Sequence, residues 1–358
     1  ARECRYYTFK NETGYTQYKL AISAVNGGSS LKLGVFNYFF TKPADSTTPW
    51  TYDSTAQTLT RDDQVIYKAQ NSGGNEIIVY SDSRNNDVYD LDFTAGFVDA
   101  NGLPVNRMLN LDTAFKNRTG VTRLIAPKHV CKIGEYGFEG CNMLNEVVLG
   151  EDFTTFGKGA FKKPASLQFV DFSQLAAETL PSELFTSCYN LQGDIVFPHV
   201  TTMLCRIQDT RVTSISLPAI ETIGYEDSWV APFGLDSCLT NIVLGESLTT
   251  ITGGQIFGKL KSVPVSIYWK SAPPTFTYAS ANLHGESSKN IVTHYLPWSK
   301  RVEWRTFAAQ NPHPNSFNIS LPEDLDGVGY WKNSGSDEYV RWWNDAPPAK
   351  SGFILIVR

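Results

Sequence analysis

The chain has 358 residues, of which 19% are charged and 13% are aromatic, and its formal net charge is -5. This composition argues against nucleic acid as a main partner, because nucleic-acid binding would need a basic face. No apolar run approaches the roughly 18 residues that a membrane-spanning helix needs. The length allows two or three compact domains, or one domain followed by a repeat array.

The sequence begins at Ala1 rather than at Met, without a charged and then apolar leader. We expect that a signal peptide or lipoprotein leader has been removed. The protein is therefore predicted to be extracellular or attached to the cell surface.

Residues 1–117 contain short segments rich in β-branched and aromatic residues, separated by turn sequences such as Asn26-Gly27-Gly28. The clearest segments are Arg5 to Phe9, Tyr18 to Ile22, Leu33 to Phe40, Val65 to Tyr67 and Ile77 to Tyr80. Closely spaced strands without helical periodicity predict an N-terminal β domain with a sandwich-like or barrel-like fold.

Four aspartates lie close together in this region, at Asp82, Asp87, Asp90 and Asp92. Oxygen-rich loops of this kind can bind calcium. The spacing lacks the ligand pattern and the fixed glycine of an EF-hand loop, and so a solvated polar turn is the preferred interpretation. No metal site and no cofactor are predicted.

A repeat begins near Val121. A strand-like triplet recurs seven times, and the third residues of the triplets are 126, 149, 172, 197, 217, 244 and 269, so that successive steps are 23, 23, 25, 20, 27 and 25 residues. A coil of this length cannot bury its apolar side chains alone. Stacking coils about 4.8 Å apart would align the same positions into inner ladders and the strands into a parallel sheet.

Other residues recur in phase with the triplet. The pattern Phe138-x-x-Cys141-x-x-Leu144 precedes Val147-Val148-Leu149, and similar patterns occupy Phe156 to Ser173 and Leu180 to Pro198. This arrangement resembles the BspA-like leucine-rich repeat, which is found mainly in bacterial cell-surface proteins. The resemblance covers about 190 residues and implies a leucine-rich-repeat solenoid over 118–310, with a last strand at His294 to Pro297 and an aromatic cap at Trp304 to Phe307.

Residues 311–358 are predicted to form a small C-terminal β segment, so that the whole chain is mainly β. Its strand-like stretches are Gly329 to Trp331, Tyr339 to Trp343 and Phe353 to Val357. Trp331, Trp342 and Trp343 could form a platform for glycan stacking, because flat aromatic faces suit sugar rings. The preferred interpretation is that these large rings close the end of the β segment.

The sequence offers little catalytic chemistry. It contains no GxGxxG, GxxxxGK[ST], HExxH or GxSxG motif, and its five histidines are not at metal-ligand spacing. Six cysteines, Cys4, Cys131, Cys141, Cys188, Cys205 and Cys238, show no zinc or CxxC pattern. Free, buried thiols are preferred over a disulfide framework, and the protein is predicted not to be an enzyme, with no catalytic residues.

The repeat geometry predicts one functional surface. The first and third residues of each triplet are expected to point inward, so that the middle residue and the residue before the triplet point outward. The residues predicted to bind a partner on this sheet face are Arg123, Ile125, Glu146, Val148, Phe169, Asp171, Val196, Val243 and Tyr268. The middle residues are mostly apolar, and either a partner or another part of the chain would cover them.

These observations predict a non-catalytic binding or adhesion protein. Its sheet face would contact a protein or glycan on a host or a neighbouring microbial surface. One alternative is carbohydrate recognition through the N-terminal β domain or the C-terminal tryptophans. A second alternative is a structural spacer with no ligand.

Overall fold

The structure is a computed structural model and describes residues 48–61, 65–71, 75–82, 89–207, 209–224, 232–233, 238–252, 256–257, 264–277, 292–310, 318–333 and 336–343. The chain divides into two compact units, one of them Ser46–Asp345 and the other Ala1–Asp45 with Ala346–Arg358. Every element described below belongs to the first unit. The strands predicted at Arg5 to Phe9, Tyr18 to Ile22, Leu33 to Phe40 and Phe353 to Val357 lie outside the described residues.

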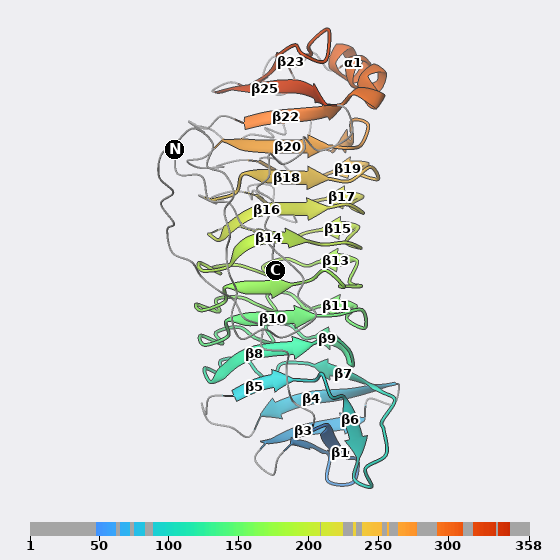
Figure 1. Ribbon diagram of the computed structural model, residues 1–358, viewed down its shortest axis with the longest axis vertical. Coiled ribbons are helices and arrows are strands. Elements are labelled where there is room, and N and C mark those ends of the chain that lie inside the picture. The colour runs from blue at the N-terminus through green and yellow to red at the C-terminus, as the bar shows by residue number, and fades with distance from the viewer. Residues whose placement is uncertain are drawn as a thin grey trace, which may run out of the picture. The chain divides into compact units, whose positions relative to one another are not determined.

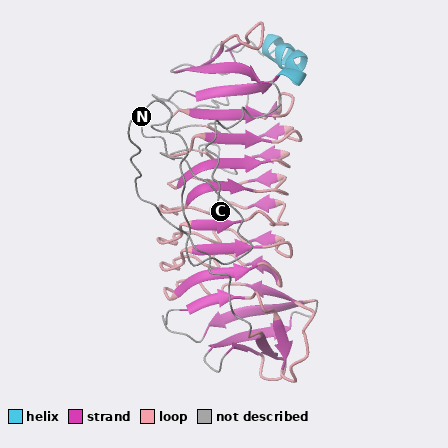
Figure 2. Ribbon diagram, in the orientation of Figure 1, coloured by secondary structure: helices cyan, strands magenta, loops and turns pink. Residues whose placement is uncertain are grey.

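The described residues are mainly β, as predicted, with a single α-helix (Figure 2). Before the repeats come β1 (Trp50–Asp53), β2 (Thr58–Arg61), β3 (Val65–Asn71), β4 (Glu76–Asp82) and β6 (Phe97–Asp99). One series of strands contains the repeated triplets and continues them at either end, and we call these the outward-face strands. They are β5 (Tyr89–Asp92), β8 (Val121–Ala126), β10 (Glu146–Leu149), β12 (Phe169–Asp171), β14 (Gln192–Val196), β16 (Arg211–Leu217), β18 (Asn241–Leu244), β20 (Val265–Trp269) and β22 (Val292–Pro297).

A second series of shorter strands alternates with these along the chain. It consists of β7 (Met108–Leu111), β9 (Val130–Ile133), β11 (Thr155–Phe156), β13 (Thr179–Leu180), β15 (Thr202–Met203), β17 (Thr222–Ile223), β19 (Thr250–Ile251) and β21 (Thr275–Phe276). At the C-terminal side follow η1 (Trp298–Lys300), α1 (Arg301–Gln310), β23 (Asn318–Ser320), β24 (Gly329–Asn333) and β25 (Ser336–Trp343).

The two series form the walls of a coil stack (Figure 1). Outward-face strands pair in parallel in the orders β5-β8-β10-β12 and β14-β16-β18-β20-β22, and the short strands pair in parallel as β7-β9-β11 and β13-β15-β17-β19-β21. All seven predicted triplets lie in outward-face strands or end one residue beyond them. The repeat predicted from the sequence is therefore confirmed.

The parallel ladders extend beyond residues 118–310 at both ends. At the N-terminal end the antiparallel strands β1 to β4 belong to the same sheet as β7 and β9, because β4 pairs in parallel with β7. At the C-terminal end β25 pairs in parallel with β22 and then in an antiparallel hairpin with β24. The predicted domain boundaries at residues 117 and 310 both lie inside the unit Ser46–Asp345.

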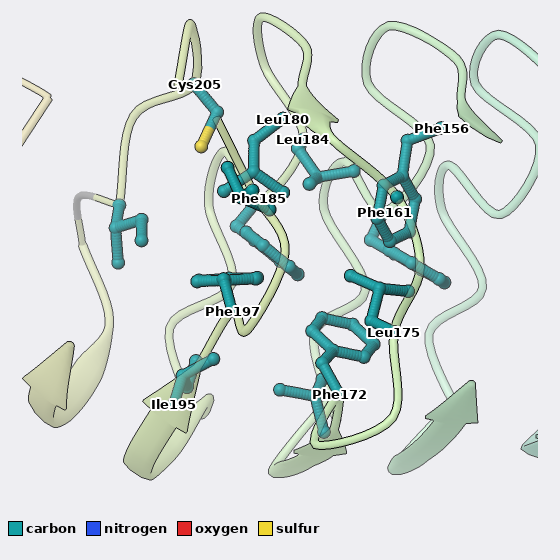
Figure 3. Close-up of a cluster of buried hydrophobic side chains, with 14 of the residues drawn as sticks. Phe156, Phe161, Phe172, Leu175, Leu180, Leu184, Phe185, Ile195, Phe197 and Cys205 are labelled. Atoms are coloured by element: carbon teal, nitrogen blue, oxygen red, sulfur yellow. The ribbon is translucent and has the colours of Figure 1, made fainter. Parts of the chain in front are cut away.

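The core between the walls consists of side-chain ladders (Figure 3). The rings of Phe115, Phe138, Phe161 and Phe185 stack in sequence, with centroid separations of 5.1, 5.7 and 6.2 Å. All four rings are fully buried. Such burial supplies the main stabilising free energy of the array, since each buried ring removes a large apolar area from water.

The cysteines of the array are small core residues. Cys131, Cys141, Cys188 and Cys205 are buried and free, and Cys238 is half-buried and free. The thiol of Cys141 donates to the carbonyl oxygen of Phe115 at 3.0 Å, and that of Cys188 donates to the carbonyl oxygen of Phe161 at 3.2 Å. The prediction of free thiols is confirmed for these five residues, whereas Cys4 lies outside the described residues.

Both walls are interrupted at one level of the stack. Among the described residues no ladder joins β12 to β14 or β11 to β13, although the amide of Gln192 still donates to the carbonyl oxygen of Gln168 at 3.1 Å. At other levels the backbones of adjacent coils approach each other closely. At Gly150 an added Cβ would lie 1.8 Å from the carbonyl oxygen of Pro127, so that only glycine fits there.

Aromatic side chains close the C-terminal end. The indole of Trp304, on α1, donates to the carbonyl oxygen of Ser271 at 3.2 Å and packs edge-on against Trp269 at 5.5 Å. Trp269 in turn donates to Nδ1 of the buried His294 at 3.1 Å. The last strand and the aromatic cap predicted at 294–307 are therefore present as β22 and α1.

Candidate functional site

The candidate site is the outward face, which we define as two columns of residues pointing away from the core on β5 to β22 and β25. Register aligns the first column in two parts, which no ladder of the described residues joins: Asp90, Arg123, Glu146 and Phe169 on β5 to β12, and Asp194, Ser214, Asn241, Ser266, Thr293 and Tyr339 on β14 to β25. The second column is Asp92, Ile125, Val148, Asp171, then Val196, Ser216, Val243, Tyr268, Tyr295, Arg341.

Burial confirms the predicted alternation of most side chains. The first and third triplet residues are buried in all seven coils, as at Val147 and Leu149. Of the nine predicted partner-binding residues, Val196 is 44% exposed, and the side chains of Arg123, Val148, Phe169, Asp171, Val243 and Tyr268 are half-buried.

Ile125 and Glu146 correct this prediction, because they are only 7% and 8% exposed. Glu146 is held by Arg123, whose Nε donates to Oε2 of Glu146 at 2.7 Å. Ile125 lies in register between Asp92 and Val148. Both residues belong to the face by position but offer little surface for direct contact.

A chain of charged groups crosses the first coils. Arg123 bridges Glu146 and Asp90, with its Nη1 3.4 Å from Oδ2 of Asp90. Burial lowers the pKa of Arg123, but the hydrogen bond to Glu146 and the nearby carboxylates of Glu146, Asp90 and Asp92 raise it above its ordinary value. Arg123 is therefore a permanent cation surrounded by carboxylates.

A hollow of about 240 Å³ lies where β8, β10 and β12 end. It is lined by two residues of the second column, Val148 and Asp171, and by Lys128, Glu151 and Ser173. Oδ1 of Asp171 accepts from the amide of Ser173 at 3.0 Å. The hollow therefore combines an apolar wall with a carboxylate fixed by the local turn.

Tyrosines mark the other end of the face. The rings of Tyr268 and Tyr295 stack at 4.7 Å with an interplanar angle of 11°. Burial and then the neighbouring Tyr295 raise the pKa of Tyr268. Tyr339 and Tyr330 are exposed and lie 5.8 Å apart between ring centroids. This end of the face is aromatic and almost uncharged.

The tryptophans considered for glycan stacking do not form an open platform. Trp342 and Trp343 are 3% and 5% exposed, and their indoles donate to the carbonyl oxygens of Pro322 at 2.8 Å and Trp269 at 3.0 Å. Their buried rings close the end of the sheet, in agreement with the preferred interpretation. The side chain of Trp331 lies outside the described residues.

The aspartates considered for calcium are placed differently from a turn. Asp90 and Asp92 lie on β5, and Oδ1 of Asp92 accepts from the amide of Thr94 at 2.9 Å. Within the described part of the chain no group of three His, Cys, Asp or Glu side chains could hold a metal ion. The residues around Asp87 lie outside that part.

The sequence reasoning missed several residues of the face. Tyr295 and Tyr339 lie on strands that the sequence predicted, but these strands were not aligned with the repeat columns. The alignment of Tyr295 with Tyr268 could have been found by treating His294-Tyr295-Leu296 as an eighth triplet. Asp90 and Asp92 were missed because two acidic residues in Tyr89–Asp92 do not suggest a strand.

Neither helix of the described residues, η1 or α1, is long and apolar enough to cross a membrane.

No curated protein matches the chain. Two solved structures share 12% and 15% of residues with it: the pneumococcal vaccine antigen PcpA (72% of this chain and 96% of the other, TM-score 0.25) and a leucine-rich repeat protein from Bacteroides ovatus (69% and 96%, TM-score 0.20). Scores this low support no argument about shape or function.

The match to a family model is more informative. Residues 111–229 match six copies of the BspA type leucine-rich repeat region. The matched segment runs from the end of β7 through β17 and so includes the coils that the sequence resemblance identified best. Residues 111–229 of this chain therefore form BspA-type leucine-rich repeats.

Proposed function

We propose that the protein is a non-catalytic adhesion or binding protein of the cell surface or extracellular space, whose outward face contacts a protein partner. BspA-type repeats are typical of surface proteins that act through protein interactions. The partner would be carried by a host or by a neighbouring microbe.

The observation that carries this proposal is the regular alignment of side chains on the outward face. Two columns of side chains run in register from β5 to β12 and again from β14 to β25, and they include exposed or half-buried apolar and aromatic groups such as Val196, Val243 and Tyr295. Apolar and tyrosine side chains on a regular sheet are suited to a protein interface, where aromatic residues supply much of the binding energy.

Capture of surface proteins from candidate host or microbial cells tests this proposal. Val196→Lys places a charge on the outward face, whereas Thr179→Lys places the same charge on the exposed first residue of β13, in the other wall. We expect Val196→Lys to fold normally and to lose the captured protein, while Thr179→Lys retains it. Equal capture by both folded variants would refute a role for the face.

A further inference from the structure

The charges of the outward face are gathered at one end. On β5, β8, β10, β12 and β14 the two columns hold five carboxylates, Asp90, Asp92, Glu146, Asp171 and Asp194, and one cation, Arg123, which gives a formal charge of -4. On β16, β18, β20 and β22 the eight residues of the same columns carry no charge. Oppositely charged partners are favoured at the first end only.

One carboxylate at this end has an unmet hydrogen bond. Oε2 of Glu146 accepts from Arg123, but Oε1 is buried and has no hydrogen-bond donor. Glu146 as a whole is 8% exposed. A buried acceptor without a donor is unfavourable, and this oxygen adds to the negative potential of this end of the face.

The hollow beside Val148 gives room for a cationic side chain, and the cation that lines it, Lys128, is paired with Glu151 at 3.4 Å. Val148 offers an apolar wall, and Asp171 offers a carboxylate of which the structure shows only Oδ1 engaged, by the amide of Ser173. Lysine and arginine carry a cation on a long aliphatic stem, so that the stem can lie on an apolar wall while the head reaches a carboxylate.

From the charge of this end and from the hollow beside Val148 we infer that the acidic end of the outward face binds a basic segment of the protein partner. A lysine or arginine side chain of that segment occupies the hollow and pairs with Asp171, and the neighbouring cations pair with Asp90 and Asp194. This inference rests on the proposed function, whose surface it divides into an acidic end for a basic segment and an aromatic end for apolar contact.

The test measures binding of a labelled peptide of alternating Arg and Ser to the full chain by fluorescence anisotropy, with a peptide of alternating Glu and Ser as a comparison. The site variant is Asp90→Asn with Asp171→Asn, because asparagine keeps one acceptor oxygen at each position. The matched control is Glu178→Gln with Glu221→Gln, which removes two exposed carboxylates next to β13 and β17.

We expect the Arg peptide to bind the wild-type chain and the control with similar affinity, and the site variant about fivefold or more weakly, with salt reducing all of these affinities. An equal loss in site and control variants would show attraction by net charge alone and would overturn the inference. If the double variant unfolds, Asp171→Asn alone serves, because its Oδ1 contact with Ser173 can remain.

Failure of this inference is distinguishable from failure of the proposed function. Loss of the captured protein in Val196→Lys together with unchanged binding in the aspartate variants would leave the face as an interface and refute the basic partner. If peptide binding depends on Asp171 but Val196→Lys captures as much surface protein as the wild type, the outward face as a whole is not the interface with the captured protein. Salt-sensitive self-association lost in the site variant would identify a second copy as the occupant and overturn a separate partner.

Discussion

Arg61, on β2, donates from Nη1 to the backbone carbonyl oxygen of Asp92, on the edge strand β5, at 2.9 Å. Its Nη2 lies 3.3 Å from the carbonyl oxygen of Asp90, and its guanidinium lies 4.5 Å from the ring centre of Trp50. The indole of Trp50 also donates to the carbonyl oxygen of Asp92, at 2.7 Å. Side chains thus satisfy the carbonyl groups of an edge strand that would otherwise offer a template for another chain.

Replacing Arg61 with methionine is expected to destabilise the protein by about 1.5–3 kcal/mol, because hydrogen bonds from a charged donor are lost while the carbonyl groups remain. We also expect concentration-dependent association through the uncovered edge. Urea unfolding and size-exclusion chromatography would measure the two effects. The control is Lys128→Met, which removes an exposed ion pair with Glu151 and should change the free energy of unfolding by less than about 1 kcal/mol. An equal loss of stability in the two variants would contradict this role of Arg61.

Truncating one ring of the core ladder should be far more costly. Phe161 stacks between Phe138 and Phe185 and is fully buried, so that Phe161→Ala is expected to lose about 3–5 kcal/mol. Phe161→Leu should lose less, since it leaves a smaller cavity. Chemical denaturation of both variants tests the order, and a leucine variant as unstable as the alanine variant would show that ring stacking rather than volume dominates.

Thiol reactivity should follow burial. Burial raises the pKa of Cys131 to about 11 and that of Cys205 to about 12, and it also raises the pKa of Cys188. Because the thiolate is the reactive form, these three residues should resist maleimide at neutral pH in the folded protein, while the half-buried Cys238 reacts sooner. Peptide mapping by mass spectrometry measures the order in which the cysteines are labelled, and labelling in denaturant serves as the control in which all of them are accessible. Labelling of the three buried cysteines before Cys238 in the folded protein would contradict this prediction.

A surface ion pair gives a pH-dependent prediction. The hydrogen bond from Lys162 lowers the pKa of Glu183 below its ordinary value of 4.5. Stability from this pair is therefore complete above pH 4.5 and is lost as the pH falls through the lowered pKa of the folded state.

Glu183→Gln should thus be less stable than the wild type by up to about 1 kcal/mol near neutral pH and equally stable in acid, since the side chains are partly exposed. Urea midpoints over a range of pH values measure the difference. A gap that does not close in acid would rule out the ion pair as its cause.

The sequence was sufficient for the parts of the fold that depend on period. The spacing of Leu124, Val147, Val170 and their equivalents predicted the parallel strands, because in-phase apolar residues have no other way of being buried together. It could not show that β4 pairs with β7, since strand texture carries no information about partners far along the chain. The interruption at β12 is likewise absent from the pattern, because the triplet Val170-Asp171-Phe172 has a spacing from its neighbours like that of the other triplets.

The sequence predicted which side chains lie on the outward face, but not how far each of them is exposed. Alternation along the strands placed Val148, Val196 and Tyr268 correctly on the outward side. Alternation alone cannot foresee that Glu146 is buried, because this depends on the reach of Arg123 from the neighbouring coil. Single-strand patterns describe direction, whereas burial depends on side chains from several strands.

The interruption between β12 and β14 bears on how the array unfolds. In a solenoid, stability is approximately the sum of the terms for each coil and for each contact between neighbouring coils. Between the coils of β12 and β14 neither wall continues its ladder in the described part of the chain, and backbone hydrogen bonds such as the one from the amide of Phe161 to the carbonyl oxygen of Leu184 join the coils instead. A ligand that binds the outward face on both sides of this level would add a contact between these two coils, and so would couple the unfolding of the two parts of the array.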